Sequence, residues 1–440
     1  MGIRITSLLP ECPALTVRPV ALLIAAAEVL FAGAFTGCSR MTAPTRPGPT
    51  FGALAPIGSS SGGVSRPGKS RFALAMPGYR FQFPRDSGSH PKYETEWWYY
   101  TGHLKSGGRT YGFEITFFRV GLLPHAPRSA SRWATSDLYF AHFAMTNVSA
   151  GSFHFTDRVD RGALGLSGAD TARENVWIQD WHARAIPGRG DPALWPQEIQ
   201  ASAPFGAIRL SLIPLKPPVI QGRNGVSLKG PGAGEASHYY SYTRLAASGT
   251  MTENGQSLPA NGLVWMDHEF SSSALAPNEE GWDWFSVQLD NGWDLMLYEL
   301  RLRPTSKTNG SSAVTGAAVS DRGAGHSISP FSSGALVAPN GSSVFLRWSD
   351  FRLTPHGTWK SPRSGAIYPS NWEIHVPRAG LDLHETPALA DQELDTGGAT
   401  GVVYWEGAMR IRGTQRGRPV SGAGYTELTG YGGARHLTVL

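Results

Sequence analysis

The fold is decided by the stretch WWYYTGHL at residues 97–104. A turn with two glycines follows it, and then comes the apolar run FEITFFR at 113–119, which together form the pattern of a β-hairpin with ring-rich strands. The pattern returns later, where WDWFSVQL at 282–289 precedes a Gly-bearing turn and LMLYELR at 295–301. We therefore expect two copies of one hairpin.

Two further pairs of segments recur in the same order. AIRLSLIP at 207–214 and GLDLHETP at 380–387 both alternate with period two and stop at a proline. GLVWMD at 262–267 and GAGYTE at 422–427 share the form Gly-x-x-aromatic-x-acid. Three pairs in one order predict a duplicated β-domain with a boundary near 271–279, each copy having about the size of one antiparallel barrel of ~8 strands.

The composition favours an all-β fold. Charged residues make up 17% of the 440, below the usual ~25%, while 53 Gly, 32 Pro and 14 Trp supply many turns and large rings. A hydrophobic content of 41% and a net charge of only +5 exclude disorder as the main state. The basic residues form no run, so we do not expect nucleic acid as a partner.

Residues 1–37 have the features of an export signal. The apolar stretch at 20–35 is shorter than the ~20 residues of a membrane span, and it contains Glu28. It runs into FTGC, which resembles a bacterial lipobox with Cys38 as the lipidated residue. A plain signal peptide or an uncleaved anchor is the alternative. Residues 38–77 are rich in Pro, Gly, Ser and Thr, and we expect a flexible linker there.

Three motifs carry a resemblance to a known family: ETEWWYYTG at 94–102, WMDHE at 265–269 and GYTELTGY at 424–431. They resemble the lipocalin-like family of carotenoid 1,2-hydratase (hydroxyneurosporene synthase) and the AttH-type secreted proteins. The resemblance implies two tandem lipocalin-like β-barrels, at 78–273 and 274–440. The family includes isoprenoid hydratases, a fungal phytoalexin hydratase and fungal cyclases, and many bacterial members are called secreted hydrolases, so the fold is implied more firmly than the reaction.

The resemblance also implies catalytic residues. Carotenoid hydratases have a His-x-Trp … Tyr-x-Asp pattern, and His238, Tyr240, Trp265 and Asp267 stand at its positions. The histidine and the aspartate match in type, whereas the two ring residues differ in type. This exchange keeps a ring at both places but moves the hydroxyl group, so a carotenoid substrate is not implied.

These residue types suit the addition of water to an alkene, which begins with a proton donor. An aspartic acid in an apolar barrel has a raised pKa, so we expect Asp267 to be that donor. The rings of Trp265, Tyr240 and Trp98 would stabilise a carbocation by up to ~2 kcal/mol each. His238 would hold or deprotonate the water. Period-two alternation places Trp265, Asp267 and Glu269 on one face, which we expect to point into the first barrel.

Further ring residues near this site are expected to contact the ligand. The predicted ligand-binding residues are Trp97, Trp98, Tyr100 and Glu269. The rings could instead be barrel core, and His238 could be an ordinary strand histidine.

The carboxylates also have structural interpretations. Asp267 could accept hydrogen bonds from a turn or pair with Arg244 or Arg119. Glu94 and Glu96 could close the base of the barrel by pairing with Arg119.

No metal or cofactor is expected. His238, Asp267, His268 and Glu269 could form a metal site, but alternation sends His268 to the face opposite Asp267. The sequence contains no His-x-x-x-His and no dinucleotide motif, and no Gly-x-Ser-x-Gly elbow of a serine hydrolase near a strand-to-helix turn.

The expected protein is an exported lipoprotein, anchored on the periplasmic side of a bacterial cell envelope. It would act on a hydrophobic, isoprenoid or lipid-like small molecule as a hydratase or hydrolase, by acid catalysis in the first barrel. The alternative is a non-enzymatic lipoprotein that holds such a molecule and passes it to an ABC transporter. A structural lipoprotein without a ligand is the third possibility.

Overall fold

The structure is a computed structural model that describes residues 72–273, 275–304, 327–396 and 401–432. The chain divides into two compact units, 1–55 and 56–440, and every described residue belongs to the second unit. The expected signal, Cys38 and most of the expected linker lie outside the described residues. Within the described ranges no helix is both long and apolar enough to cross a membrane.

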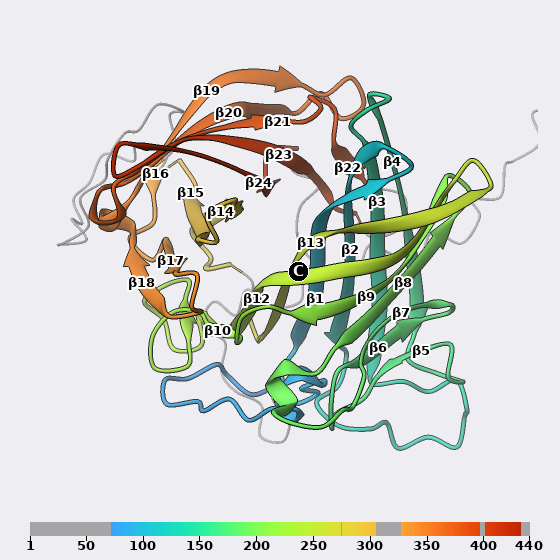
Figure 1. The fold of residues 1–440 in the computed structure, drawn as a ribbon. Helices are drawn as coiled ribbons and strands as arrows, with labels where there is room; N and C mark the ends of the chain where they lie inside the picture. The colour runs from blue at the N-terminus through green and yellow to red at the C-terminus, as the bar shows by residue number, and fades with distance from the viewer. Residues whose placement is uncertain (1–71, 274, 305–326, 397–400, 433–440) are drawn as a thin grey trace, which may run out of the picture. The chain divides into compact units, whose positions relative to one another are not determined.

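The described residues form two curled antiparallel sheets, which confirms the predicted all-β fold with two tandem barrels (Figure 1). The first sheet contains β1 (Thr95–Ser106), β2 (Arg109–Gly121), β3 (Asp137–Asn147), β4 (Ser152–Arg161), β5 (Ser167–Ala169), β6 (Asn175–Ile178), β7 (Trp181–Ala185), β8 (Gln197–Ala203), β9 (Gly206–Pro214), β10 (Val219–Ile220), β11 (Ser227–Leu228), β12 (Ala236–Glu253) and β13 (Gln256–Ser271).

The second sheet follows it in the chain. It contains β14 (Glu279–Leu289), β15 (Asp294–Leu302), β16 (Ser327–Ile328), β17 (Ser333–Val337), β18 (Ser343–Arg347), β19 (Arg352–Lys360), β20 (Ile367–Val376), β21 (Leu381–Pro387), β22 (Glu393–Asp395), β23 (Val403–Gln415) and β24 (Arg418–Thr429). The described helical segments are single 3₁₀ turns: η1 (Arg85–Ser87), η2 (Pro192–Leu194), η3 (Trp348–Asp350) and η4 (Pro377–Ala379).

The two sheets share one strand order. The central path of the first is β3-β2-β1-β13-β12-β9-β8-β7, and that of the second is β17-β15-β14-β24-β23-β21-β20-β19. The three repeated sequence pairs therefore occupy equivalent places: β1–β2 with β14–β15, β9 with β21, and β13 with β24. The duplication read from the sequence is confirmed in the topology.

The predicted hairpins form as expected. Gly107 and Gly108 join β1 to β2, and both have positive φ angles, 55° and 78°, which a two-residue turn with the twist of the strands requires. The turn sets the register in which Tyr99 lies opposite Thr116. Side chains at even and odd positions of β1 then point to opposite faces of the sheet.

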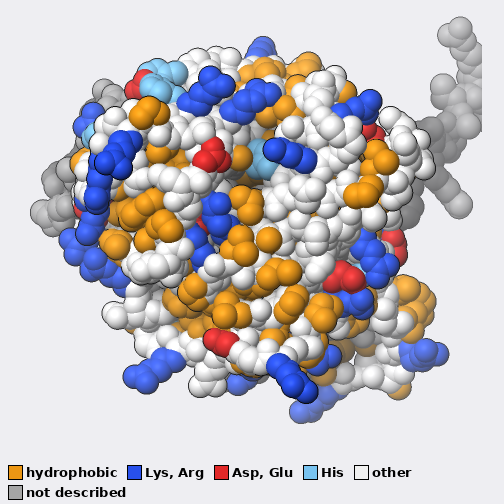
Figure 2. All heavy atoms as spheres, viewed as in Figure 1, with side chains coloured by type: hydrophobic (Ala, Val, Ile, Leu, Met, Phe, Trp, Pro, Cys, Tyr) orange, Lys and Arg blue, Asp and Glu red, His pale blue; other side chains and the backbone are white. Residues whose placement is uncertain are grey.

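Each sheet encloses its own apolar core. The first core joins side chains of β1, β2 and β3 to those of β6 through β9, and the second joins β14 and β15 to β20, β21, β23 and β24. A third cluster contains residues of both sheets, among them Tyr99 and Trp265 from the first and Trp284 and Tyr425 from the second. On the molecular face in Figure 2, Lys and Arg side chains are scattered among apolar and neutral ones.

The third cluster depends on a close approach between strands. A Cβ atom on Gly112 of β2 would lie 2.6 Å from the Cβ of Ala408 and 2.7 Å from the hydroxyl of Tyr425, both in the second sheet. Gly112 thus leaves the space that these two side chains fill.

We predict that Gly112→Val lowers the free energy of unfolding by about 1–3 kcal/mol, because the added methyl groups push the sheets apart. Urea unfolding followed by Trp fluorescence measures this. Gly188→Val is the control, since a Cβ at exposed Gly188 meets nothing within 4 Å. Equal stability of the two variants would contradict the packing described.

Candidate functional site

A cavity of about 60 Å³ lies between the two sheets. Its lining residues are Trp97, Tyr99, Thr116, Phe118, Lys229, Tyr239, Asp267, Glu269, Trp282, Trp284, Tyr298, Leu300, Tyr404 and Glu427. Large rings form most of its wall, and the polar groups are three carboxyls, one ammonium and several hydroxyls. A space of this size holds a few water-sized molecules or one end of a longer ligand.

Asp267 is the most strongly hydrogen-bonded carboxyl of the cavity. Its Oδ2 accepts from the Tyr239 hydroxyl at 2.6 Å, and its Oδ1 accepts from Ser241 Oγ at 2.5 Å and from Trp265 Nε1 at 2.8 Å. The three donors come from β12 and β13, because Ser241 is the register partner of Asp267 and Tyr239 that of Glu269.

Burial raises the pKa of Asp267 to about 7, although the three donors favour the charged form and so lower it. The charge of Glu269 adds to the increase. The direction agrees with that expected from the sequence. At neutral pH a substantial fraction of Asp267 therefore carries a proton.

The opposite wall belongs to the second sheet. Glu427 accepts a hydrogen bond from Trp282 Nε1 at 2.8 Å, and burial raises the pKa of Glu427 to about 7. Trp284 Nε1 donates to the Tyr239 hydroxyl at 3.2 Å, so it joins the second sheet to the hydrogen bonds of Asp267.

The ammonium group of Lys229 balances part of the negative charge of the cavity carboxyls. Lys229 Nζ lies 3.1 Å from Glu269 Oε1 and 4.7 Å from the centre of the Tyr298 ring. Burial acts to lower the pKa of Lys229, but Glu269, Tyr298 and Glu279 together outweigh it, and the pKa is raised. Lys229 therefore stays a cation and is no candidate for a neutral amine nucleophile.

The structure divides the predicted site residues between two places. Trp97, Asp267 and Glu269 line the cavity between the sheets, and Trp265 contacts Asp267 there. The predicted alternation along β13 is present, because Met266 belongs to the core of the first sheet.

The expected direction of this face is wrong. We expected Trp265, Asp267 and Glu269 to point into the first barrel, and they point toward the second sheet instead. The physical reason is that both faces of β1 and β13 are buried, so no polar face marks the outside.

The other predicted residues face the interior of the first barrel. Trp98, Tyr100 and Tyr240 belong to its core. His238 Nδ1 lies 2.6 Å from the Gly225 carbonyl oxygen, and burial lowers the pKa of His238. His238 is thus held as an ordinary strand histidine, on the face opposite Asp267, and the expected cooperation of the two on one water is not possible in this arrangement.

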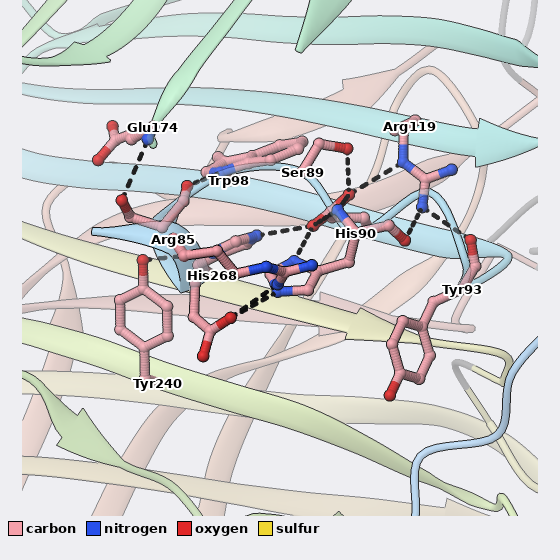
Figure 3. A network of polar contacts seen from close by, with 12 residues as sticks. Arg85, Ser89, His90, Tyr93, Trp98, Arg119, Glu174, Tyr240 and His268 are labelled. Carbon is pink, nitrogen blue, oxygen red and sulfur yellow. Dashed lines mark hydrogen bonds and ion pairs between the residues drawn. The ribbon is translucent and has the colours of Figure 1, made fainter. Parts of the chain in front are cut away.

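A polar network closes the interior of the first barrel (Figure 3). The Glu96 carboxylate accepts from Arg119 Nε at 2.9 Å, which is one of the pairs expected from the sequence, and it contacts His90 Nδ1 at 2.8 Å and His268 Nε2 at 3.0 Å. The Tyr240 hydroxyl lies 3.2 Å from His268 Nδ1.

Three side chains of this network, His90, Glu96 and His268, are of types that bind metal ions, and they lie close together. One ligand atom each of His90, Glu96 and His268 lies within 4.8 Å of the others. Each of these atoms already has a hydrogen-bond partner within the set, and the Arg119 guanidinium is paired with the same carboxylate. The positive charge of Arg119 opposes a bound cation, so we interpret the network as the closure of the barrel.

Sequence reasoning missed several residues that line the cavity, and it missed Ser241, which donates a hydrogen bond to Asp267. Tyr239, Ser241, Lys229 and Trp284 were not singled out, and neither was Glu427. Two signals could have found some of them: strand pairing brings Tyr239 and Ser241 beside Asp267, and the form Gly-x-x-aromatic-x-acid equates Glu427 with Asp267.

Comparison with known families shows to which family the chain belongs. The sequence matches the AttH-like family over residues 74–329 and 322–431. The chain belongs to the AttH-like family. A search of curated proteins finds no match.

Two solved structures are similar to this chain in fold. The chain is similar to an AttH protein from Nitrosomonas europaea, with 32% identity, a TM-score of 0.68, and coverage of 82% of this chain and 100% of that one. It is also similar to kievitone hydratase from Nectria haematococca, with 12% identity, a TM-score of 0.57, and coverage of 82% and 96%. The second likeness shows a shared fold alone.

The buried carboxyls between the two sheets predict that the free energy of unfolding depends on pH. Burial raises the pKa of Glu114 to about 8, and those of Asp267 and Glu427 to about 7. Between pH 5 and 8 the folded state holds protons that the unfolded state releases, so the free energy of unfolding falls as pH rises.

Glu114→Gln removes one of these groups, because an amide cannot ionise. We predict a shallower decline of stability between pH 5 and 8 for this variant, measured by urea unfolding at several pH values. Asp290→Asn, at an exposed carboxyl whose side-chain partner is the hydroxyl of Ser421, is the control and should keep the slope of the native protein. Parallel pH profiles for all three proteins would contradict the burial argument.

Proposed function

We propose that this protein adds water to a carbon–carbon double bond in a hydrophobic, isoprenoid or lipid-like molecule, in the cavity between the sheets. The observation that carries the proposal is Asp267, a carboxyl with a pKa raised to about 7 beside a ring-lined cavity. A protonated carboxyl near neutral pH is what the first step needs.

Tyr239 is the route from Asp267 to the substrate. Its hydroxyl is 2.6 Å from Asp267 Oδ2, and both side chains line the cavity. Both oxygens of Asp267 already have hydrogen-bond partners, so Tyr239 stands between Asp267 Oδ2 and a substrate. In the first step the Tyr239 hydroxyl gives its proton to an alkene carbon, whose π electrons form the new C–H bond. When Asp267 is protonated on Oδ2, the hydrogen bond between the two groups is reversed, with Oδ2–H donating to the Tyr239 oxygen. Asp267 gives this proton to the Tyr239 oxygen at the same time, and the neighbouring carbon becomes a cation.

The second step is the attack of water on that cation. A lone pair of the water oxygen forms the C–O bond, and one O–H bond of the water breaks with its electrons staying on oxygen. The released proton goes to a carboxylate of the cavity. The product is an alcohol, and the proton balance of the protein is unchanged after the cycle.

The cavity wall suits the cation between the two steps. Trp97, Trp282 and Trp284 line it, and a desolvated ring whose face meets a cation stabilises it by up to ~2 kcal/mol. The small volume fits the reacting end of a longer chain better than a whole terpenoid. The name of the structural relative kievitone hydratase, and the resemblance to carotenoid hydratases, are consistent with this reaction class.

We also propose a membrane setting. An acyl chain on Cys38 would hold the protein on the periplasmic side of the envelope, close to hydrophobic substrates. An ABC transporter would then be the partner that delivers the substrate or removes the product.

A carrier of an unchanged hydrophobic ligand is the second candidate function. The three hydrogen bonds that Asp267 accepts favour this function, because they give the Asp267 carboxyl a structural role. A carrier would not need a protonated carboxyl.

Oxygen-18 labelling separates the two functions. The purified full-length protein is incubated with an apolar extract of its source cells in oxygen-18 water, and free and bound compounds are compared by mass spectrometry. We predict a compound heavier by one labelled water, formed at least 100-fold more slowly by Asp267→Asn. Two fragments whose masses together equal the substrate plus one labelled water, with the label in only one of them, would indicate hydrolysis.

Asp382→Asn is the matched control, because it makes the same change at an exposed aspartate. It should leave the rate unchanged. A compound that the protein retains without label and without change, in the native protein and in Asp267→Asn alike, would contradict the hydratase and support the carrier.

A further inference from the structure

We infer that Glu427 is a second catalytic residue, which takes the proton from the attacking water. The inference rests on the proposed hydration and assigns the base that the second step requires. It also gives the second barrel a share of the chemistry.

The duplication places Glu427 at the position equivalent to Asp267. In the first sheet Asp267 of β13 lies opposite Tyr99 of β1, and in the second sheet Glu427 of β24 lies opposite Trp284 of β14. Tyr99 and Trp284 hold corresponding places in the repeated hairpin, and their rings contact each other at 5.3 Å between centroids. The two carboxyls therefore approach one cavity from the two repeats, and both line it.

Glu427 has the better access to a bound water. It is partly exposed, while Asp267 is only 3% exposed. Asp267 accepts three hydrogen bonds, and Glu427 accepts one, from Trp282 to Oε2. Among the described residues no donor reaches Oε1 of Glu427, so this atom can accept a hydrogen bond from water in the cavity.

The charge of Asp267 changes the pKa of Glu427 in the direction that the second step needs. After burial and the Trp282 hydrogen bond, the charge of Asp267 is the next influence on Glu427, and it raises the pKa of Glu427. When Asp267 has given up its proton in the first step, it becomes an anion, and Glu427 then binds a proton more strongly. The first step thus prepares the base for the second.

The cycle closes within the cavity. Glu427 holds the proton from water, and Asp267 is ionised. Transfer of that proton from Glu427 to Asp267, through water and Tyr239, restores the starting state. No oxidant, reductant or further reactant is needed.

Deuterium exchange separates the two roles. The full-length protein and the same apolar extract are incubated in heavy water, and the deuterium content of the unreacted alkene and the yield of alcohol are both measured. Reversible protonation by Asp267 and Tyr239 places deuterium in the alkene, whereas alcohol requires the base. We predict that Glu427→Gln keeps the exchange and forms alcohol at least 100-fold more slowly.

The controls keep the outcomes distinct. Glu385→Gln changes another fully buried carboxyl of the second sheet that does not line the cavity, and it should exchange and hydrate like the native protein. Asp267→Asn should lose both exchange and alcohol. Thermal melting of each variant reports whether it is folded.

Two results would overturn the inference. Alcohol formation by Glu427→Gln at the native rate would show that Glu427 is not the base. Equal loss of exchange and alcohol in a folded Glu427→Gln would show that Glu427 acts in the first step or only shapes the cavity. A native protein that neither exchanges nor hydrates any compound would instead refute the proposed function itself.

Discussion

The packing of one sheet against the other, through strands β1 and β13 on one side and β14 and β24 on the other, is the constraint on which the rest depends. These strands bury both faces, one in their own barrel and one between the sheets. Rings fill most of the contact, and carboxyls that accompany them lose their water. The desolvation that raises the pKa of Asp267 and of Glu427 to about 7 is a direct result of this packing.

The same contact explains why the cavity needs two domains. Hydrogen bonds cross it at several points, such as Tyr99 to Glu406 at 2.8 Å and His142 to Tyr404 at 2.7 Å. In a single barrel the carboxyls of Asp267 and Glu427 would be exposed to water, and their pKa values would return toward the ordinary range. Duplication thus creates an environment that neither copy has alone, and the pseudo-equivalent acids follow from it.

Much of the fold could be predicted from the sequence. The glycines at 107 and 108, the alternation of the strands and the three repeated pairs predict hairpins and a duplicated sheet, and the topology has both. These signals are local, so they survive without knowledge of tertiary contacts.

The site could be predicted only in part. Asp267 was identified with the correct direction of its pKa, but Tyr240 was chosen although its neighbour Tyr239 reaches Asp267. A one-residue step along a strand reverses the face, and a strand with two buried faces has no polar side to indicate which is which. His238 and Asp267 match a family pattern in sequence, yet the sheet separates them by that same alternation.

The proposed hydration depends on the raised pKa of Asp267, which the contact between the sheets causes. Carbon-13 NMR of the full-length protein labelled at aspartate carboxyls, assigned with Asp267→Asn, measures this directly. We predict that Asp267 titrates near pH 7, in line with its raised pKa of about 7. Titration near the ordinary aspartate value of about 4 would contradict it.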